Sequence, residues 1–359
     1  MKTKLICLMA LLLWCDVAVA QYLWVNLSFK AVLNPTNGAR YYNFTEANID
    51  RTIGQVNEML AIHQRGYRFR RAEPIRNVGG INQTNGPSKW YSVNPRDNDL
   101  ATGDWDNRKQ MEIEALNAPV AYAWNFNAVN YFITAGYGVA PQDAGDCAFP
   151  TGNNHLIVLG TVDNPYVLLH ETGHFFELYH TQGSCDCGHA NQGCISTNGY
   201  WVGNDDVPGY VLSDTIFDSE CLTLNDVAMA NYNRALLFLT AAELKLATDT
   251  FYNNMSYHPG TNQVRLTELQ LHKWTDFANG ARLPVMSGRT RFVSTFGVNS
   301  GAGTISTAPV RTISYAAGVA TAGQDILLLR QGNYNEQLTI NKALTLRATR
   351  DGWATIGRP

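Results

Sequence analysis

The first part of the chain alternates between strand-like and helix-like patterns of apolar residues. Residues 23–33 alternate between apolar and polar positions and predict a strand. Residues 44–66 carry an apolar stripe at helical spacing, with Thr45 in place to cap the helix. Residues 67–75 predict a second strand. Strands and helices that alternate in this way favour helices packed on a sheet.

The middle of the chain continues this pattern and then becomes irregular. Residues 105–118 predict a helix, and the apolar runs at 128–134 and 155–160 predict strands. The segment 77–104 is rich in Asn, Gly, Asp and Pro, which predicts a long surface loop. Beyond the second run the chain is rich in Cys and turn residues, until a last helix predicted at 239–253. We therefore expect an α+β domain, in which a twisted mixed sheet with its helices lies over a loop-rich lower subdomain.

The composition changes toward the C-terminal end. Residues 276–305 are rich in Gly, Ser, Thr, Asn and Ala and predict a linker. Short β-branched runs follow it, at Ile326–Leu329, Leu338–Ile340, Leu344–Leu346 and Ala354–Ile356. Residues 332–348, GNYNEQLTINKALTLRA, resemble one coil of a right-handed parallel β-helix. We expect residues 306–359 to form a small all-β appendage: a truncated β-helix, a cap packed on the preceding domain, or strands of a β-sandwich.

The first 20 residues have the pattern of a secretory signal peptide. Lys2 and Lys4 precede an apolar run over residues 5–14, and residues 18–20 form a small-x-small cleavage site. The apolar run is too short to span a bilayer. We therefore expect an exported chain, extracellular or periplasmic, with no membrane span.

Charge and cysteine content narrow the choice of function. The net charge is −3 and the chain has no basic run, so we expect no nucleic-acid partner. Five cysteines follow the signal peptide: Cys147, Cys185, Cys187, Cys194 and Cys221. In an exported protein they predict disulfides, and the alternative is a small structural zinc site within residues 185–194.

The strongest chemical signal is the segment LLHETGHFFELYHTQG. On a helix, His170 and His174 project from one face, one turn apart, which suits two ligands of a tetrahedral zinc ion. Glu171 lies beside them, where a carboxylate can act as a general base. His180 would lie about 15 Å from His170 along a continuing helix, so it can reach the same metal only if the helix ends before it.

The turn that this requires predicts a specific backbone feature. A sharp reversal near residues 176–178 favours a left-handed conformation, which Gly adopts at little cost, and this chain has Glu177 there. A residue with a side chain costs about 1–2 kcal/mol more in that conformation. A zinc site with several ligands can offset this cost. We therefore predict a positive φ, or a turn of altered shape, at Glu177.

HETGHFFELYHT resembles the HExxHxxGxxH zinc signature of the metzincin metallopeptidases, and most closely that of the pappalysin/cytophagalysin branch. The resemblance implies a zincin-like catalytic domain over residues 21–275, with an active-site helix and Glu171 as general base. The implied zinc ligands are His170, His174 and His180. NDVAMANYN resembles the Met-turn of this family, which implies that Met229 forms a hydrophobic floor under the metal.

The same resemblance implies further site residues. The family places a Tyr two residues after that Met, where its hydroxyl stabilises the tetrahedral intermediate; here Asn231 holds that position and Tyr232, one residue later, is the candidate. GNDDVPGYVLSDTIFD resembles the family's acidic loop with an insertion. Its carboxylates either bind a structural calcium ion or are solvated loop residues. They are Asp205, Asp206, Asp214 and Asp218.

These patterns predict a secreted zinc-dependent endopeptidase, which hydrolyses a protein or peptide substrate through a zinc-bound water activated by Glu171. One alternative is a gluzincin-like zinc hydrolase with a different third ligand, for which zinc content of a His180→Ala variant is the test. Another is a non-catalytic protein that contacts polysaccharide or a surface through residues 306–359. Removing that segment and assaying casein against glycans separates this reading from the peptidase.

Overall fold

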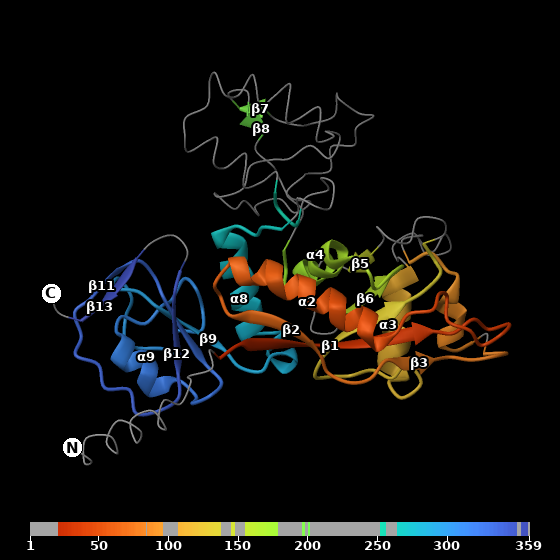
Figure 1. Ribbon diagram of the computed structural model, residues 1–359, viewed down its shortest axis with the longest axis horizontal. Helices are drawn as coiled ribbons and strands as arrows, with labels where there is room; N and C mark the ends of the chain where they lie inside the picture. The colour runs from red at the N-terminus through yellow and green to blue at the C-terminus, as the bar shows by residue number, and fades with distance from the viewer. Residues whose placement is uncertain are drawn as a thin grey trace, which may run out of the picture.

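The computed structural model shows a mixed α+β fold, in which a six-stranded mixed sheet packs against helices (Figure 1). The described residues are 21–83, 85–95, 107–137, 145–147, 155–178, 252–255, 264–349 and 353–357, with the backbone of two short strands, β7 (Ser196–Thr197) and β8 (Tyr200–Trp201). The predicted signal peptide lies outside them, and so do residues 239–251 of the helix predicted at 239–253; its last two residues, 252 and 253, are described and are not helical.

The main sheet is built largely from the predicted strands. Its strands are β1 (Leu23–Val32), β2 (Tyr67–Arg71), β3 (Arg76–Val78), β4 (Val129–Ile133), β5 (Gly145–Cys147) and β6 (Leu156–Leu159). Their order is β2-β1-β4-β6-β5, and β3 pairs with β1 beyond the end of β2. All these pairs are parallel except β5–β6, so an antiparallel strand forms one edge of the sheet. Every residue of β4 and β6 is buried, as expected for strands covered on both faces.

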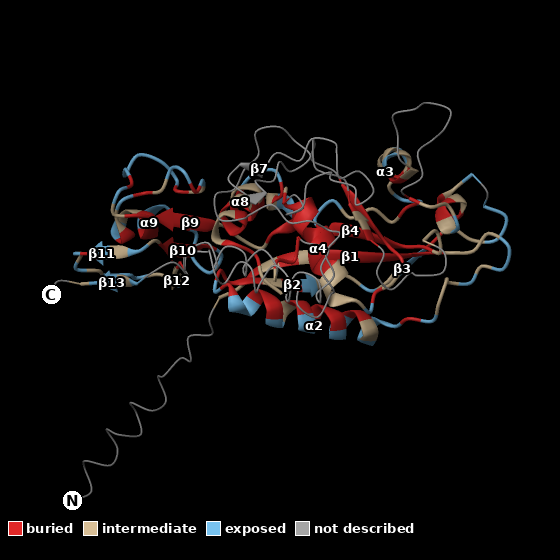
Figure 2. Ribbon diagram, turned by 90° about the horizontal axis from the view of Figure 1, so that it is seen from above, coloured by how far each residue is buried: buried red, intermediate tan, exposed pale blue. Residues whose placement is uncertain are grey.

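Helix α2 (Glu46–Ile62) begins at the residue that the sequence predicts. The side chain of Thr45 accepts a hydrogen bond from the backbone N–H of Asn48, and the side chain of Asn48 caps the backbone of Thr45 in return. Its apolar stripe, which includes Ile53 and Val56, is buried against the sheet, and its opposite side is exposed (Figure 2). The predicted amphipathic helix is therefore confirmed.

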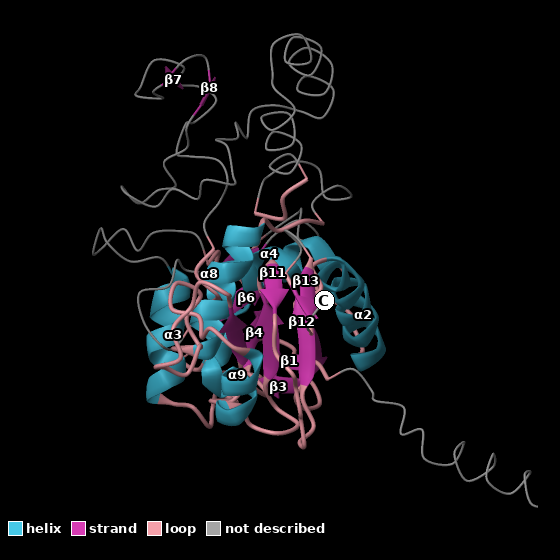
Figure 3. Cartoon of the chain, turned by 90° about the vertical axis from the view of Figure 1, so that its left-hand side faces the viewer, coloured by secondary structure: helices cyan, strands magenta, loops and turns pink. Residues whose placement is uncertain are grey.

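Helices cover both faces of the sheet (Figure 3). The other large helices are α3 (Asn107–Asn117), α4 (Pro165–Phe175) and α8 (Glu268–Asn279). α2, α4 and α8 share one core, whereas α3 packs on the other face with the short helix η1 (Pro87–Tyr91), which lies within the predicted loop. None of the described helices is long and apolar enough to cross a bilayer.

Residues 276–305, predicted to be a linker, belong to the folded structure. They contain the end of α8, the short helix η5 (Leu283–Val285) and strand β9 (Thr290–Val293). Every residue of β9 is buried. Their small residues allow close contact between backbones. A Cβ added at Gly288, for example, would lie 1.9 Å from the carbonyl oxygen of Gln324. The composition that suggested a linker here reflects tight packing.

The C-terminal strands pair in parallel. Strand β10 (Ile326–Leu329) pairs with β9 and with β12 (Thr345–Ala348), and β11 (Gly332–Tyr334) pairs with β13 (Ala354–Ile356). β10 and β13 match the predicted runs, β12 begins one residue late, and residues 338–340 form no strand. Helix α9 (Ile313–Val319) precedes β10 and packs in the same small core.

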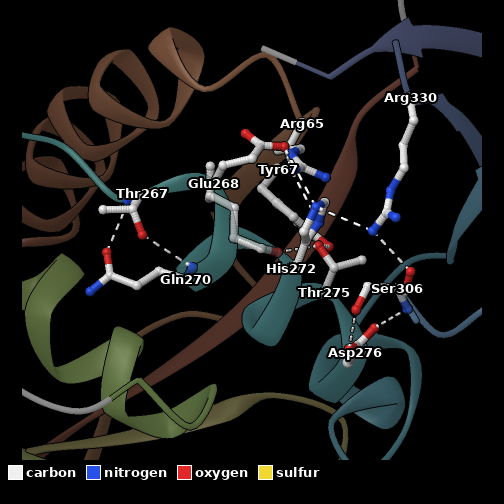
Figure 4. Close-up of polar contacts among 11 residues, drawn as sticks. Arg65, Tyr67, Thr267, Glu268, Gln270, His272, Thr275, Asp276, Ser306 and Arg330 are labelled. Carbon is white, nitrogen blue, oxygen red and sulfur yellow. Dashed lines mark hydrogen bonds and ion pairs between the residues drawn. The ribbon is translucent and has the colours of Figure 1, made fainter. Parts of the chain in front are cut away.

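A polar network joins α8 to the C-terminal strands (Figure 4). Arg330, which follows β10, donates to the carbonyl of Ser306 at 2.9 Å. Asp276 of α8 accepts from the backbone N–H and the hydroxyl of Ser306, both at 2.6 Å. Arg65, before β2, forms an ion pair with Glu268 of α8. Helix α8 therefore contacts the N-terminal sheet on one side and the C-terminal strands on the other.

Candidate functional site

The helix that carries the histidines starts at a well-formed N-cap. The side chain of Asn164 accepts hydrogen bonds from the backbone N–H groups of Tyr166 and Val167, at 3.0 and 3.2 Å. Pro165 occupies the first turn of α4, where its missing N–H costs nothing. Leu169 and its neighbours are buried in the main core, which sets the helix rotation. The sequence thus determines where α4 begins and which side faces the sheet.

The structure brings His170 and His174 together as the sequence predicts. Both side chains are buried, and their Nε2 atoms lie 3.1 Å apart. The Nδ1 atom of His170 lies 2.6 Å from the carbonyl oxygen of Asn254. The Nδ1 atom of His174 lies 2.7 Å from the carbonyl oxygen of Leu178. Each ring is therefore held in place by a backbone carbonyl on its far side.

These two contacts determine where the protons are. A carbonyl oxygen only accepts hydrogen bonds, so Nδ1 of each ring must donate, and in the neutral ring Nε2 then carries a lone pair. Lone pairs 3.1 Å apart repel each other unless a cation or a proton lies between or beside them. Metal-binding histidines are typically oriented in this way, with the second nitrogen donating to a carbonyl. The donor set of His170 and His174 therefore fits zinc.

The end of α4 shows the backbone feature predicted from the sequence. The helix ends at Phe175, and Glu177 has φ = 67°. The N–H of Glu177 bonds to the carbonyl of His174 at 2.9 Å, and the N–H of Leu178 bonds to that of Gly173 at 3.0 Å. This is the Schellman pattern, in which the residue after the cap is left-handed. The reversal also carries the carbonyl of Leu178 back onto His174.

Glu171 lies against the antiparallel edge strand. Its side chain is buried, and a Cβ added at Gly145 of β5 would lie 2.6 Å from its Cγ and 2.8 Å from Oε1. Only a glycine at position 145 leaves room for this carboxylate. Burial raises the pKa of the Cys147 thiol, on the same strand, well above its ordinary value, and the charge of Glu171 raises it further. The carboxylate is therefore placed between the histidine helix and a sheet edge.

A methionine that the sequence analysis missed packs against the same turn of α4. Met255 is fully buried, and a Cβ added at Gly173 would lie 2.5 Å from its Sδ atom. The neighbouring carbonyl of Asn254 holds His170, so this segment supports both the helix backbone and one ring. The signal in the sequence was Met255 followed two residues later by Tyr257, the spacing expected of a Met-turn.

Several predicted site residues lie outside the described residues. They are His180, Asp205, Asp206, Asp214, Asp218, Met229 and Tyr232. Within the described part of the chain, no three His, Cys, Asp or Glu side chains form a group that could hold a metal ion. Cys147 is a buried thiol, whereas Cys185, Cys187, Cys194 and Cys221 lie outside the described residues. The structure thus brings His170 and His174 together and places Glu171 of the same helix against β5, and the remaining assignments stay predictions.

Comparison with known proteins leaves the family open. A scan against protein-family models finds no family that matches the chain. A search of curated proteins finds no match either. The resemblance to metzincins therefore depends on the histidine segment and on the geometry around it.

Proposed function

We propose that this chain is a zinc-dependent endopeptidase. The observation that carries the proposal is the histidine pair, whose Nδ1 atoms donate to backbone carbonyls while their Nε2 atoms lie 3.1 Å apart. Two rings fixed in this way on successive turns of one buried helix form half of a tetrahedral zinc site. When bound there, zinc would polarise the substrate carbonyl and lower the pKa of a coordinated water.

The third ligand in this proposal is His180. The chain leaves α4 through the left-handed turn at Glu177, and Leu178 already lies against His174. His180 follows two residues later and lies outside the described residues; a chain that reverses at Glu177 does not continue along the helix axis, so we expect His180 to return toward the pair. This supports the metzincin order of ligands over a gluzincin-like site.

Glu171 is the proposed general base. It follows His170 directly, and its buried carboxylate lies beside the backbone of β5. It would take a proton from the attacking water and pass it to the amine of the leaving product. β5 is an edge strand of the main sheet, so a substrate peptide could pair with it in extended form beside this carboxylate.

Met255 and Tyr257 are the proposed floor and hydroxyl donor of the site. Met255 packs on the turn of α4 that carries the histidines, and Tyr257 keeps the two-residue spacing that the pair Met229 and Tyr232 lacks. Replacing each tyrosine by Phe separates the two assignments. We expect Tyr257→Phe to lower kcat by about 10²-fold with little change in KM, and Tyr232→Phe to leave both unchanged. The opposite result would restore the assignment to Met229 and Tyr232.

Metal analysis of the full chain is the primary test. We expect about one zinc ion per chain, and its loss in His174→Ala and His180→Ala. His272→Ala is the control, because this histidine lies in the polar network of α8 and should not affect zinc content. Zinc retained in His180→Ala would favour a different third ligand. A chain that binds no zinc would exclude the proposal and leave the histidine pair joined by a shared proton.

Peptide cleavage then tests the mechanism. We expect Glu171→Ala to keep its zinc and to lose hydrolysis of casein by at least about 10²-fold. Loss of the carboxylate removes the base without removing a ligand, so zinc content and activity should separate. Cleavage at the rate of the unchanged chain would contradict the role of Glu171. Cleavage that survives removal of zinc would contradict the metal mechanism.

A further inference from the structure

A pair of buried amides joins helix α8 to the segment that holds His170. Gln270 of α8 is 3% exposed, and Asn253 is fully buried. Nδ2 of Asn253 donates to Oε1 of Gln270 at 2.8 Å, and Nε2 of Gln270 donates to Oδ1 of Asn253 at 3.3 Å. The two side chains therefore form a reciprocal pair, and neither belongs to the proposed set of zinc ligands.

Two backbone N–H groups fix the orientation of both amides. A backbone N–H can only donate, so the side-chain atom that accepts from it must be the amide oxygen. The N–H of Thr267 donates to Oε1 of Gln270 at 2.9 Å, as part of the capping box at the start of α8 (Figure 4). The N–H of Met255 donates to Oδ1 of Asn253 at 2.9 Å. A flip of either amide would therefore place donor against donor.

The bond from Met255 also orients the carbonyl that holds His170. The N–H of Met255 and the carbonyl of Asn254 belong to one planar trans peptide unit, so they point in opposite directions. Asn253 holds this unit at its N–H, and Nδ1 of His170 donates to its carbonyl at 2.6 Å. Rotation of the unit would leave the buried N–H of His170 without its acceptor, and the ring would lose the contact that sets its orientation.

We propose that Gln270 is a positioning residue for the zinc ligand His170. It acts through Asn253 and the peptide unit between Asn254 and Met255, without contacting the metal itself. The inference rests on the proposed zinc site, and it assigns part of the zinc affinity to helix α8, which carries none of the proposed ligands. Residues that orient a metal ligand in this way typically change metal affinity by about 10- to 100-fold.

Competition with a chelator measures the zinc affinity of the full chain. In Gln270→Glu the second carboxylate oxygen faces Oδ1 of Asn253, so one hydrogen bond of the pair becomes a repulsion, and we expect zinc to bind at least about tenfold more weakly. A protonated carboxyl donates as the amide does, and burial raises the pKa of a carboxyl. The loss, relative to the unchanged chain at the same pH, should therefore shrink as the pH falls from about 9 to about 6. Gln270→Met has neither donor nor acceptor oxygen, so its loss should be the same at every pH.

Asn279→Ala is the matched control on the same helix. Asn279 is buried, and its amide bonds to the backbone of Thr290 in β9 instead of to Asn253. We expect this variant to keep the zinc affinity of the unchanged chain and the visible absorption of its cobalt form, whereas both change in Gln270→Met. Unchanged zinc affinity in both Gln270 variants, or a loss in Gln270→Glu that is the same at every pH, would overturn the inference and leave the proposed function standing. A chain that binds no zinc would exclude both.

Discussion

Replacing Glu177 by glycine should stabilise the protein. The residue has φ = 67° at the end of the histidine helix, where a side chain is unfavourable. Its carboxylate contributes little in compensation, because burial raises its pKa, an effect that the charges of Lys273, Arg282 and His155 oppose only in part. The stability of Glu177→Gly is best compared with that of Glu177→Ala, because alanine also removes the carboxylate but keeps the Cβ. The difference between these two variants isolates the backbone strain.

The magnitude follows from two opposing effects. A non-glycine residue costs about 1–2 kcal/mol in the left-handed conformation. Glycine loses about 0.4–1 kcal/mol of this advantage, because it has more conformational freedom in the unfolded chain than alanine has. We therefore expect Glu177→Gly to be more stable than Glu177→Ala by about 1 kcal/mol, or about 2 °C in Tm. The turn itself is unchanged, so zinc content and peptide cleavage should be retained.

Equilibrium unfolding in urea measures this difference. Glu58 lies on the exposed side of α2 and offers a matched control with right-handed backbone. There the sign should invert, with Glu58→Gly less stable than Glu58→Ala by about 1 kcal/mol. If glycine is the less stable choice at both positions, the left-handed turn at Glu177 does not exist in solution.

Three further predictions concern other parts of the fold. Burial lowers the pKa of Lys30 from 10.5 to about 7. Between those values the unfolded chain binds more protons, so stability should rise with pH by at most about 1.4 kcal/mol per unit, and urea unfolding of Lys30→Met should lack this rise. Gly145→Ala should lower kcat/KM for peptide cleavage by at least about tenfold with zinc content intact, because the new Cβ overlaps Glu171; unchanged kinetics would contradict this packing. Asp276→Ala should reduce the free energy of unfolding by about 2 kcal/mol and Ser306→Ala by less, because the second keeps the backbone hydrogen bond. Equal losses would refute that reasoning.

Local sequence patterns predicted most strands of the main sheet and the pairing of His170 with His174. β1, α2, β2, β4 and β6 all follow from apolar periodicity, and Thr45 caps α2 as predicted. Helices α8 and α9 were not predicted. In α8, Gln270 is buried and Asp276 is half-buried, and both make hydrogen bonds to residues outside the helix. Leu271, Trp274 and Ala278 nevertheless recur at helical spacing, and Thr267 forms a capping box with Gln270, so the pattern of this helix is present in the sequence.

The sequence by itself determined the pairing of His170 with His174 and the reversal at Glu177. The pairing depends only on helix geometry, whereas the reversal opposes the local preference of Glu177 and was predicted because His180 must reach the same metal. Tertiary structure decided what holds the pair in place. The carbonyl of Asn254 reaches His170 from 84 residues away, and the side chain of Arg282 reaches the end of the same helix from 107 residues away. Such contacts arise when separate segments pack on one core, and no local pattern encodes them.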